Sequence, residues 1–134
     1  MAIFKRNIHK TSRRSRRLSE AHEDQPGIIV QGLFVGGLYG QQVDPWTAVT
    51  VLVEGKPKSF IALGRRSSGW IPHHPGKAEL EFRGSGLRVD DMHISDLSVQ
   101  VPTSGHVLVT FLAPRPNYFR TSPDRMAKWN VRNI

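Results

Sequence analysis

Apolar and polar residues alternate along the middle of the chain in the manner of β-strands. Ala78, Leu80 and Phe82 alternate with charged residues, which is the period of two expected for a strand with one face in water. Residues 47–53 form a nearly continuous apolar run, which is typical of a strand buried on both faces. The pattern therefore predicts a β-rich fold.

Further short apolar segments indicate more strands, separated by turn residues. These segments are residues 28–35, 59–63, 87–89, 92–101 and 106–112. The sequence Glu54-Gly55-Lys56-Pro57-Lys58 is typical of a hairpin turn between antiparallel strands, because glycine supplies unusual dihedral angles and proline interrupts a ladder. The apolar positions change parity near Ser95-Asp96, so we expect a β-bulge there.

The two ends of the chain differ from this middle. Residues 1–25 lack a sustained apolar period and contain a run of arginines too dense to fold alone, so we expect a disordered basic arm with an acidic linker. Pro26-Gly27 marks the start of a single β-rich domain, residues 26–134. Near the C-terminus, Ser122-Pro123-Asp124 is typical of a helix start, which predicts a short basic helix at the end of the domain.

Together these elements predict an all-β protein, either an antiparallel sandwich or a partly open barrel of about six to eight strands. A disordered basic N-terminal arm precedes it and a short C-terminal helix follows. A chain of 134 residues has room for one such domain. The layout of basic arm, acidic linker and compact β domain resembles that of small viral coat and matrix proteins, and this resemblance implies a structural role.

The excess positive charge is concentrated at the two ends. The formal net charge is +8; residues 1–24 hold seven basic and three acidic residues, and residues 115–134 hold five basic and one acidic, so each end contributes +4. The stretch between them holds seven of each sign and is neutral. A neutral globule with cationic ends predicts an anionic partner.

We interpret the cationic ends as a surface that binds nucleic acid or an anionic membrane, because each guanidinium offers a planar fork of donors to phosphate. The residues concerned are Lys5, Arg6, Lys10, Arg13, Arg14, Arg16, Arg17, Arg115, Arg120, Arg125, Lys128 and Arg132. Tyr118 and Trp129 either stack on unpaired bases or anchor the tail to the core. Arg16-Arg17-Leu18-Ser19 resembles a basophilic kinase site, so Ser19 is a candidate phosphorylation site where added negative charge would weaken anion binding.

Several kinds of chemistry lack their sequence signals. The chain has no cysteine, which excludes disulfides and thiolate chemistry. The glycines at 32, 36, 37 and 40 do not have the spacing of a nucleotide-binding loop, and Gly76-Lys77 is followed by Ala78, which lacks the required hydroxyl. We therefore expect no cofactor.

The histidines and clustered acids do not point to catalysis either. His73 and His74 are adjacent in an extended segment, where neighbouring side chains point to opposite sides, so we expect a surface loop and no metal site. Asp90, Asp91 and Asp96 lie close to His93 in sequence but form no recognisable nucleophile and base. We expect His93 and His106 to be structural and the protein not to be an enzyme.

We favour the function of a non-enzymatic structural protein that self-associates into a homo-oligomer. We expect it to bind nucleic acid, with RNA or single-stranded nucleic acid as the first expectation, as viral coat or packaging proteins do. One alternative is a peripheral membrane protein of matrix type, in which Ile3 and Phe4 insert into the bilayer. Another is a small β-rich enzyme or ligand-binding domain, which requires a concave polar pocket at the His73 to Lys77 loop or the Asp90 to Asp96 turn. No apolar run is long enough for a membrane span, and the N-terminal residues lack the apolar stretch of a secretory signal. We therefore expect a soluble protein inside the cell, or in a virion or host cell if it is viral. Nuclear or mitochondrial targeting by the basic arm is an alternative.

Overall fold

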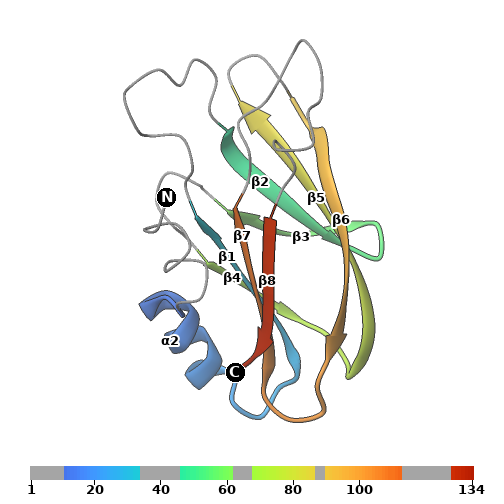
Figure 1. Cartoon of the computed structure of the whole chain (residues 1–134). Helices are drawn as coiled ribbons and strands as arrows, with labels where there is room; N and C mark the ends of the chain where they lie inside the picture. The colour runs from blue at the N-terminus through green and yellow to red at the C-terminus, as the bar shows by residue number, and fades with distance from the viewer. Residues whose placement is uncertain (1–10, 34–45, 62–67, 87–89, 113–127) are drawn as a thin grey trace.

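In the part of the chain that the structure describes, two four-stranded β-sheets pack face to face, with one short helix outside them (Figure 1). The computed structural model describes residues 11–33, 46–61, 68–86, 90–112 and 128–134. The elements are α2 (Arg13–Ala21), β1 (Gly27–Leu33), β2 (Trp46–Val53), β3 (Lys56–Ile61), β4 (Ser68–Pro72), β5 (Gly76–Gly86), β6 (Met92–Val101), β7 (His106–Leu112) and β8 (Lys128–Asn133). The predicted all-β sandwich is confirmed.

The strand order is β4-β1-β7-β8 in one sheet and β3-β2-β5-β6 in the other. All neighbouring strands are antiparallel except β1 and β7, which run parallel from Gly27 opposite His106 to Leu33 opposite Leu112. The prediction of a purely antiparallel sandwich is wrong for this pair. Both strands are central and largely apolar, as strands in parallel pairs generally are.

The core lies between the two sheets and is made of the alternate residues that face inward. It comprises Ile28, Val30, Val49, Val51, Val53, Ile61, Ile71, Ala78, Leu80, Phe82, Val99, Val101, Val107 and Val109. Trp129 of β8 closes it on one side, with its ring centroid 4.3 Å from that of Phe82 on the opposite sheet. The alternation predicted for β5 therefore describes which of its residues enter the core.

The predicted bulge is present in the pairing of β5 with β6. Phe82 lies opposite Ser95 and Arg83 opposite His93, which leaves Ile94 as the extra residue, next to the predicted position. Since an extra residue reverses the parity of the strand, Ile94 packs against the core together with Leu97.

The predicted C-terminal helix is wrong for the described end of the chain. Residues Lys128–Asn133 form β8, which pairs antiparallel with β7. In this segment Trp129 and Val131 alternate with polar residues, which is the strand period, and the free side of β7 supplies a backbone partner. The helix-start residues Ser122-Pro123-Asp124 lie outside the described residues.

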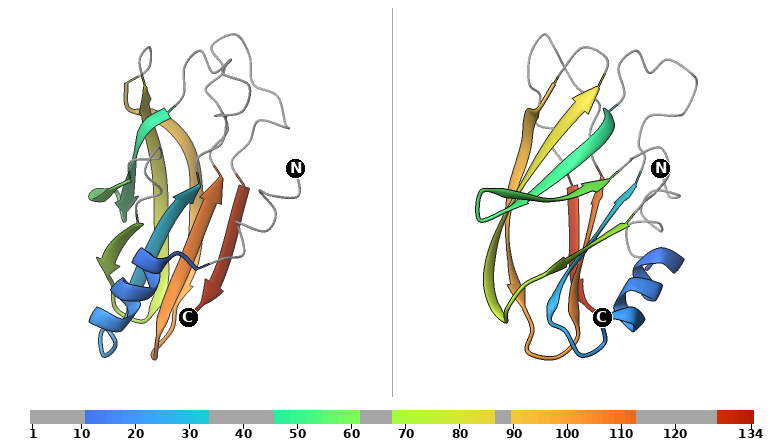
Figure 2. Two further views of the ribbon diagram at one scale, coloured as in Figure 1. Left: turned by 90° about the vertical axis from the view of Figure 1, so that its left-hand side faces the viewer. Right: turned by 180° about the vertical axis from the view of Figure 1, so that it is seen from behind.

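The prediction of a disordered arm is wrong for residues 13–21, which form helix α2. Ser12 caps the helix, because its hydroxyl accepts a 3.0 Å hydrogen bond from the Ser15 amide. The helix lies on the outer side of the β4-β1-β7-β8 sheet, beside β1 and β4 (Figure 2). Tertiary contacts rather than local charge therefore decide the conformation of this segment.

Candidate nucleic-acid interface

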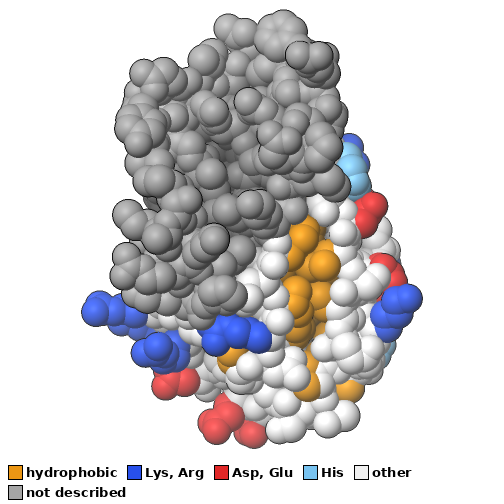
Figure 3. Space-filling view, viewed as in Figure 1, with side chains coloured by type: hydrophobic (Ala, Val, Ile, Leu, Met, Phe, Trp, Pro, Cys, Tyr) orange, Lys and Arg blue, Asp and Glu red, His pale blue; other side chains and the backbone are white. Residues whose placement is uncertain are grey.

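Helix α2 has two chemically different faces. Ser12, Ser15, Ser19 and His22 recur at intervals of three and four residues, so they lie on one side of the helix, the side that contacts the sheet. The arginines at 13, 14, 16 and 17 are exposed to solvent. Figure 3 shows basic side chains gathered where α2 lies at the surface.

A buried polar network joins the middle of α2 to the sheet. Ser15 is fully buried, and its hydroxyl donates a 2.6 Å hydrogen bond to the side-chain oxygen of Gln31. The same oxygen accepts from the amide of Ser12 at 3.1 Å, while the side-chain nitrogen of Gln31 donates to the hydroxyl of Thr110 at 2.9 Å. Because Gln31 and Thr110 are opposite each other in the β1–β7 register, the sheet presents them as one preformed anchor.

A second anchor holds the end of α2. Nε2 of His106, the first residue of β7, lies 2.8 Å from the carbonyl oxygen of His22 and 2.9 Å from that of Gln25. Carbonyl oxygens only accept, so Nε2 carries the proton and donates to both. In the tautomer with its proton on Nε2, Nδ1 accepts from the hydroxyl of Ser19 at 2.9 Å. His106 is only 1% exposed, and it fixes both the last turn of α2 and the chain that follows it.

Aromatic rings complete this contact. The imidazole of His22 stacks on the indole of Trp70 at 4.3 Å with an interplanar angle of 7°, and Trp70 meets His106 edge-on at 4.9 Å. Gly27 leaves the space for Trp70, since a Cβ there would lie 2.3 Å from the indole. The structural role predicted for His106 did not include this connection to α2. The serine spacing at 12, 15 and 19 was the available signal.

The charges on α2 run against the helix dipole. The arginines occupy its first half, near the positive end, while Glu20, Glu23 and Asp24 lie at or beyond its last turn; the first turn has no acid and the last turn no base. Each exposed charge at the wrong end of a helix costs about 0.3–1 kcal/mol at low salt. The helix dipole therefore disfavours the arginines at these positions, and an anionic partner would offset this cost.

Of the other residues predicted from the sequence to bind an anionic partner, some lie near α2 and others do not. Arg132 of β8 donates from Nη2 to the hydroxyl of Thr11, directly before the helix. Lys128 lies on the same strand, opposite Leu112. Trp129 packs on the core, which favours its interpretation as an anchor over base stacking. The remaining members lie outside the described residues: Lys5, Arg6, Lys10, Arg115, Tyr118, Arg120 and Arg125.

A separate charged cluster occupies the exposed face of β5 and β6. Oε2 of Glu81 accepts hydrogen bonds from Arg83 at 2.7 Å and from Nδ1 of His93 at 2.9 Å, and these bonds, the His93 bond first, hold the pKa of Glu81 below its ordinary value of 4.5. Candidate ligand atoms of Glu81, His93 and Asp96 lie within 4.8 Å of one another, so these three residues could hold a metal ion. Because Arg83 already occupies the Glu81 oxygen, we interpret the cluster as a cross-strand ion-pair network.

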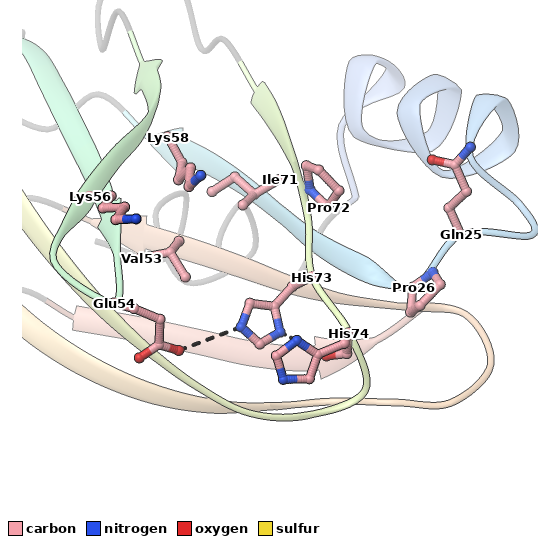
Figure 4. Close-up of a pocket in the computed structure, with 10 residues that line it drawn as sticks. All are labelled: Gln25, Pro26, Val53, Glu54, Lys56, Lys58, Ile71, Pro72, His73 and His74. Atoms are coloured by element: carbon pink, nitrogen blue, oxygen red, sulfur yellow. Dashed lines mark hydrogen bonds and ion pairs between the residues drawn. The ribbon is translucent and has the colours of Figure 1, made fainter.

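The His73 loop, expected to lie simply at the surface, lines a pocket (Figure 4). The pocket has a volume of about 650 Å³ and is open to solvent. It lies between β3, the end of β4 and the chain that leads from α2 into β1.

No protein-family model matches this chain, and neither does a curated protein sequence or a solved structure. Within the described part of the chain, no helix has the length and the apolar character needed to cross a bilayer.

Proposed function

We propose that this protein is a non-enzymatic structural protein that binds nucleic acid through the arginine face of α2. The observation that carries the proposal is the division of α2 into two faces. One is held to the sheet by the buried side chains of Ser15 and Gln31 and by His106, and the other exposes four arginines. A helix already docked on the fold loses little conformational freedom when it binds phosphate, so more of the electrostatic attraction contributes to affinity.

The spacing of the arginines suits a polyanion. Arg13 and Arg17 are four residues apart, which places their backbones about 6 Å apart along the helix axis and on the same side. Each guanidinium offers a forked set of donors, and each phosphate contact releases condensed counterions. Affinity should therefore be strongly salt-dependent and largely independent of base sequence.

The membrane alternative has less support in α2. An interfacial helix buries a large apolar face in the bilayer. Among the described residues, α2 exposes no large apolar side chain, and Leu18 is half-buried. The face opposite the arginines is polar and occupied by the sheet.

Self-association is the second part of the proposal. Figure 3 shows an apolar strip on the face where β6 and β8 lie, and these are edge strands of the two sheets. On these strands Val131 is 44% exposed, and Leu97 and Trp129 are only partly buried. Edge strands with exposed apolar side chains are sites where a second chain can pair.

Sedimentation of the wild type and of Val131→Lys tests self-association. The wild type should sediment as an oligomer and the variant as a smaller species. A monomeric wild type would contradict this part of the proposal.

Two triple variants of equal charge test the binding proposal. Arg13→Gln/Arg16→Gln/Arg17→Gln removes three cations from α2, and Lys56→Gln/Lys58→Gln/Lys77→Gln removes three from elsewhere on the described surface. Both are titrated with single-stranded RNA, duplex DNA and anionic liposomes over a salt series. Only the arginine variant should lose nucleic-acid affinity, and the slope of log K against log salt should decrease in magnitude by about 2 to 3.

The outcomes separate the alternatives. Preferential binding of the wild type to liposomes would favour the membrane function. Equal loss in the two triple variants would show that net charge alone attracts nucleic acid, and would overturn the role of α2.

A further inference from the structure

The pocket beside β3 has an apolar floor and a cationic rim. Pro26 and Pro72 contribute apolar surface, Val53 and Ile71 line the pocket as core residues that are only 4% and 1% exposed, and Lys56 and Lys58 contribute ammonium groups (Figure 4). Ligand sites typically occupy about 300–1,000 Å³ and combine mostly apolar walls with a few polar groups, and the pocket of about 650 Å³ has this character.

A β-bulge turns Lys56 toward the pocket. Ser59 lies opposite Val51, but the next register pair is Pro57 with Leu52, so Lys58 is the extra residue. Beyond the shift, Lys56 lies opposite Val53, whose side chain faces the core. In an unshifted strand Lys56 would share the outward face of Phe60, which is 73% exposed. Bulges often re-aim side chains at functional sites in this way.

His73 adds a buried polar side chain to the wall. Only 7% of its side chain is exposed, and its Nε2 lies 3.5 Å from Oε1 of Glu54. Nδ1 lies 2.7 Å from the carbonyl oxygen of His74, so it carries a proton and donates. Glu54 also accepts a hydrogen bond from the Glu79 amide at 3.3 Å. Lys56 and Lys58 are exposed at the mouth of the pocket, so their ammonium groups are open to a ligand.

The far wall is fixed by hydrogen bonds on both sides. The carbonyl oxygen of Pro26 accepts from the His73 amide at 3.2 Å, and that of Gln25 accepts from His106 at 2.9 Å. Both residues line the pocket, so the segment that anchors α2 is also one of its walls. The pocket is therefore largely preformed, as small-molecule sites usually are.

We infer that this pocket binds a small anionic molecule with an apolar body. Lys56 and Lys58 hold a phosphate or carboxylate head, and Pro26 and Pro72 pack against the apolar part. The site is separate from the arginine face of α2, so either proposal stands or fails without the other.

Nuclear magnetic resonance titration of the full chain tests the inference with defined probes. Octyl phosphate and octanoate carry a head and a tail, inorganic phosphate carries the head alone, and 1-octanol carries the tail alone; the amphiphiles are kept below their micelle concentrations. Saturable shifts at the amides of Val53, Ile71 and His73 are expected with octyl phosphate or octanoate. Whichever of octyl phosphate and octanoate binds with the lower dissociation constant identifies the preferred head group. Each part alone should bind at least about tenfold more weakly.

Matched double variants locate the head group. Lys56→Gln/Lys58→Gln should weaken binding about tenfold or more, because charge-assisted hydrogen bonds are lost. Arg13→Gln/Arg16→Gln removes the same charge from α2 and should leave binding unchanged. Absence of saturable shifts with both amphiphiles, or equal weakening in the two double variants, would overturn the inference.

Discussion

The hydroxyl of Ser19 lies 2.9 Å from Nδ1 of His106, a residue 87 positions further along the chain. This contact, with the two carbonyl oxygens held by Nε2 of the same ring, makes His106 the point at which α2 is tied to the sandwich. The arginine face depends on it, because a helix of nine residues has little stability of its own.

Replacing His106 should release α2. His106→Ala removes donors from two carbonyl groups and leaves a cavity beside Trp70, so we expect the free energy of unfolding to fall by about 2–4 kcal/mol. Ser19→Ala, which removes one hydrogen bond, should cost about 0.5–1.5 kcal/mol. Urea unfolding measures both values, and hydrogen exchange of residues 13–21 measures docking. Unchanged protection of α2 in His106→Ala would show that the helix is held by other contacts.

Negative charge at Ser19 should undock the helix more strongly than loss of the hydroxyl. A phosphate there carries about two negative charges and would lie against the site where His106 holds the His22 and Gln25 carbonyls. We expect Ser19→Glu to increase amide exchange across α2 beyond the level of Ser19→Ala, and to weaken nucleic-acid binding. Ser104→Glu, at an exposed serine elsewhere, is the control. Equal exchange in Ser19→Glu and Ser104→Glu would contradict the expected switch.

The Gln31 anchor should show strong coupling between its members. Gln31→Leu keeps the volume but removes the side chain that accepts from Ser12 and Ser15 and donates to Thr110, and we expect the free energy of unfolding to fall by about 2–3 kcal/mol. Replacing all three polar groups, as Ser15→Ala/Gln31→Leu/Thr110→Val, should recover part of that loss, since the two buried hydroxyls that bonded to Gln31 are then removed as well. Chemical denaturation of the single and triple variants measures the difference. A triple variant less stable than the sum of its parts would argue against a network.

The strands could be predicted because the alternation of apolar and polar residues within each strand is a local signal. Helix α2 could not be predicted, because contacts with residues distant in sequence stabilise it. The alternation around Leu80 and the parity change at Ile94 follow from which face of one strand is buried. The arginine run at 13–17 locally disfavours folding, and beyond the Ser12 cap the helix is stabilised by partners distant in sequence, Gln31 and His106. The pocket was missed for the same reason, since Lys56 faces it only through a register shift against β2.

Acid should remove the contribution of Glu81 to stability. Hydrogen bonds from His93 and Arg83 lower the pKa of Glu81 in the folded protein below the ordinary 4.5, so its stabilising effect is present above that value and is lost as pH falls through the lower, folded-state pKa. Asp96 and Asp91 also face this network, through His93 and Arg83 respectively. We therefore expect Glu81→Gln to be less stable than the wild type at about pH 6, with the difference shrinking toward about pH 3. Urea unfolding across this range measures it, with Glu23→Gln as a control at an exposed acid. If both variants show the same pH dependence, general charge rather than the cross-strand bonds controls the acid response.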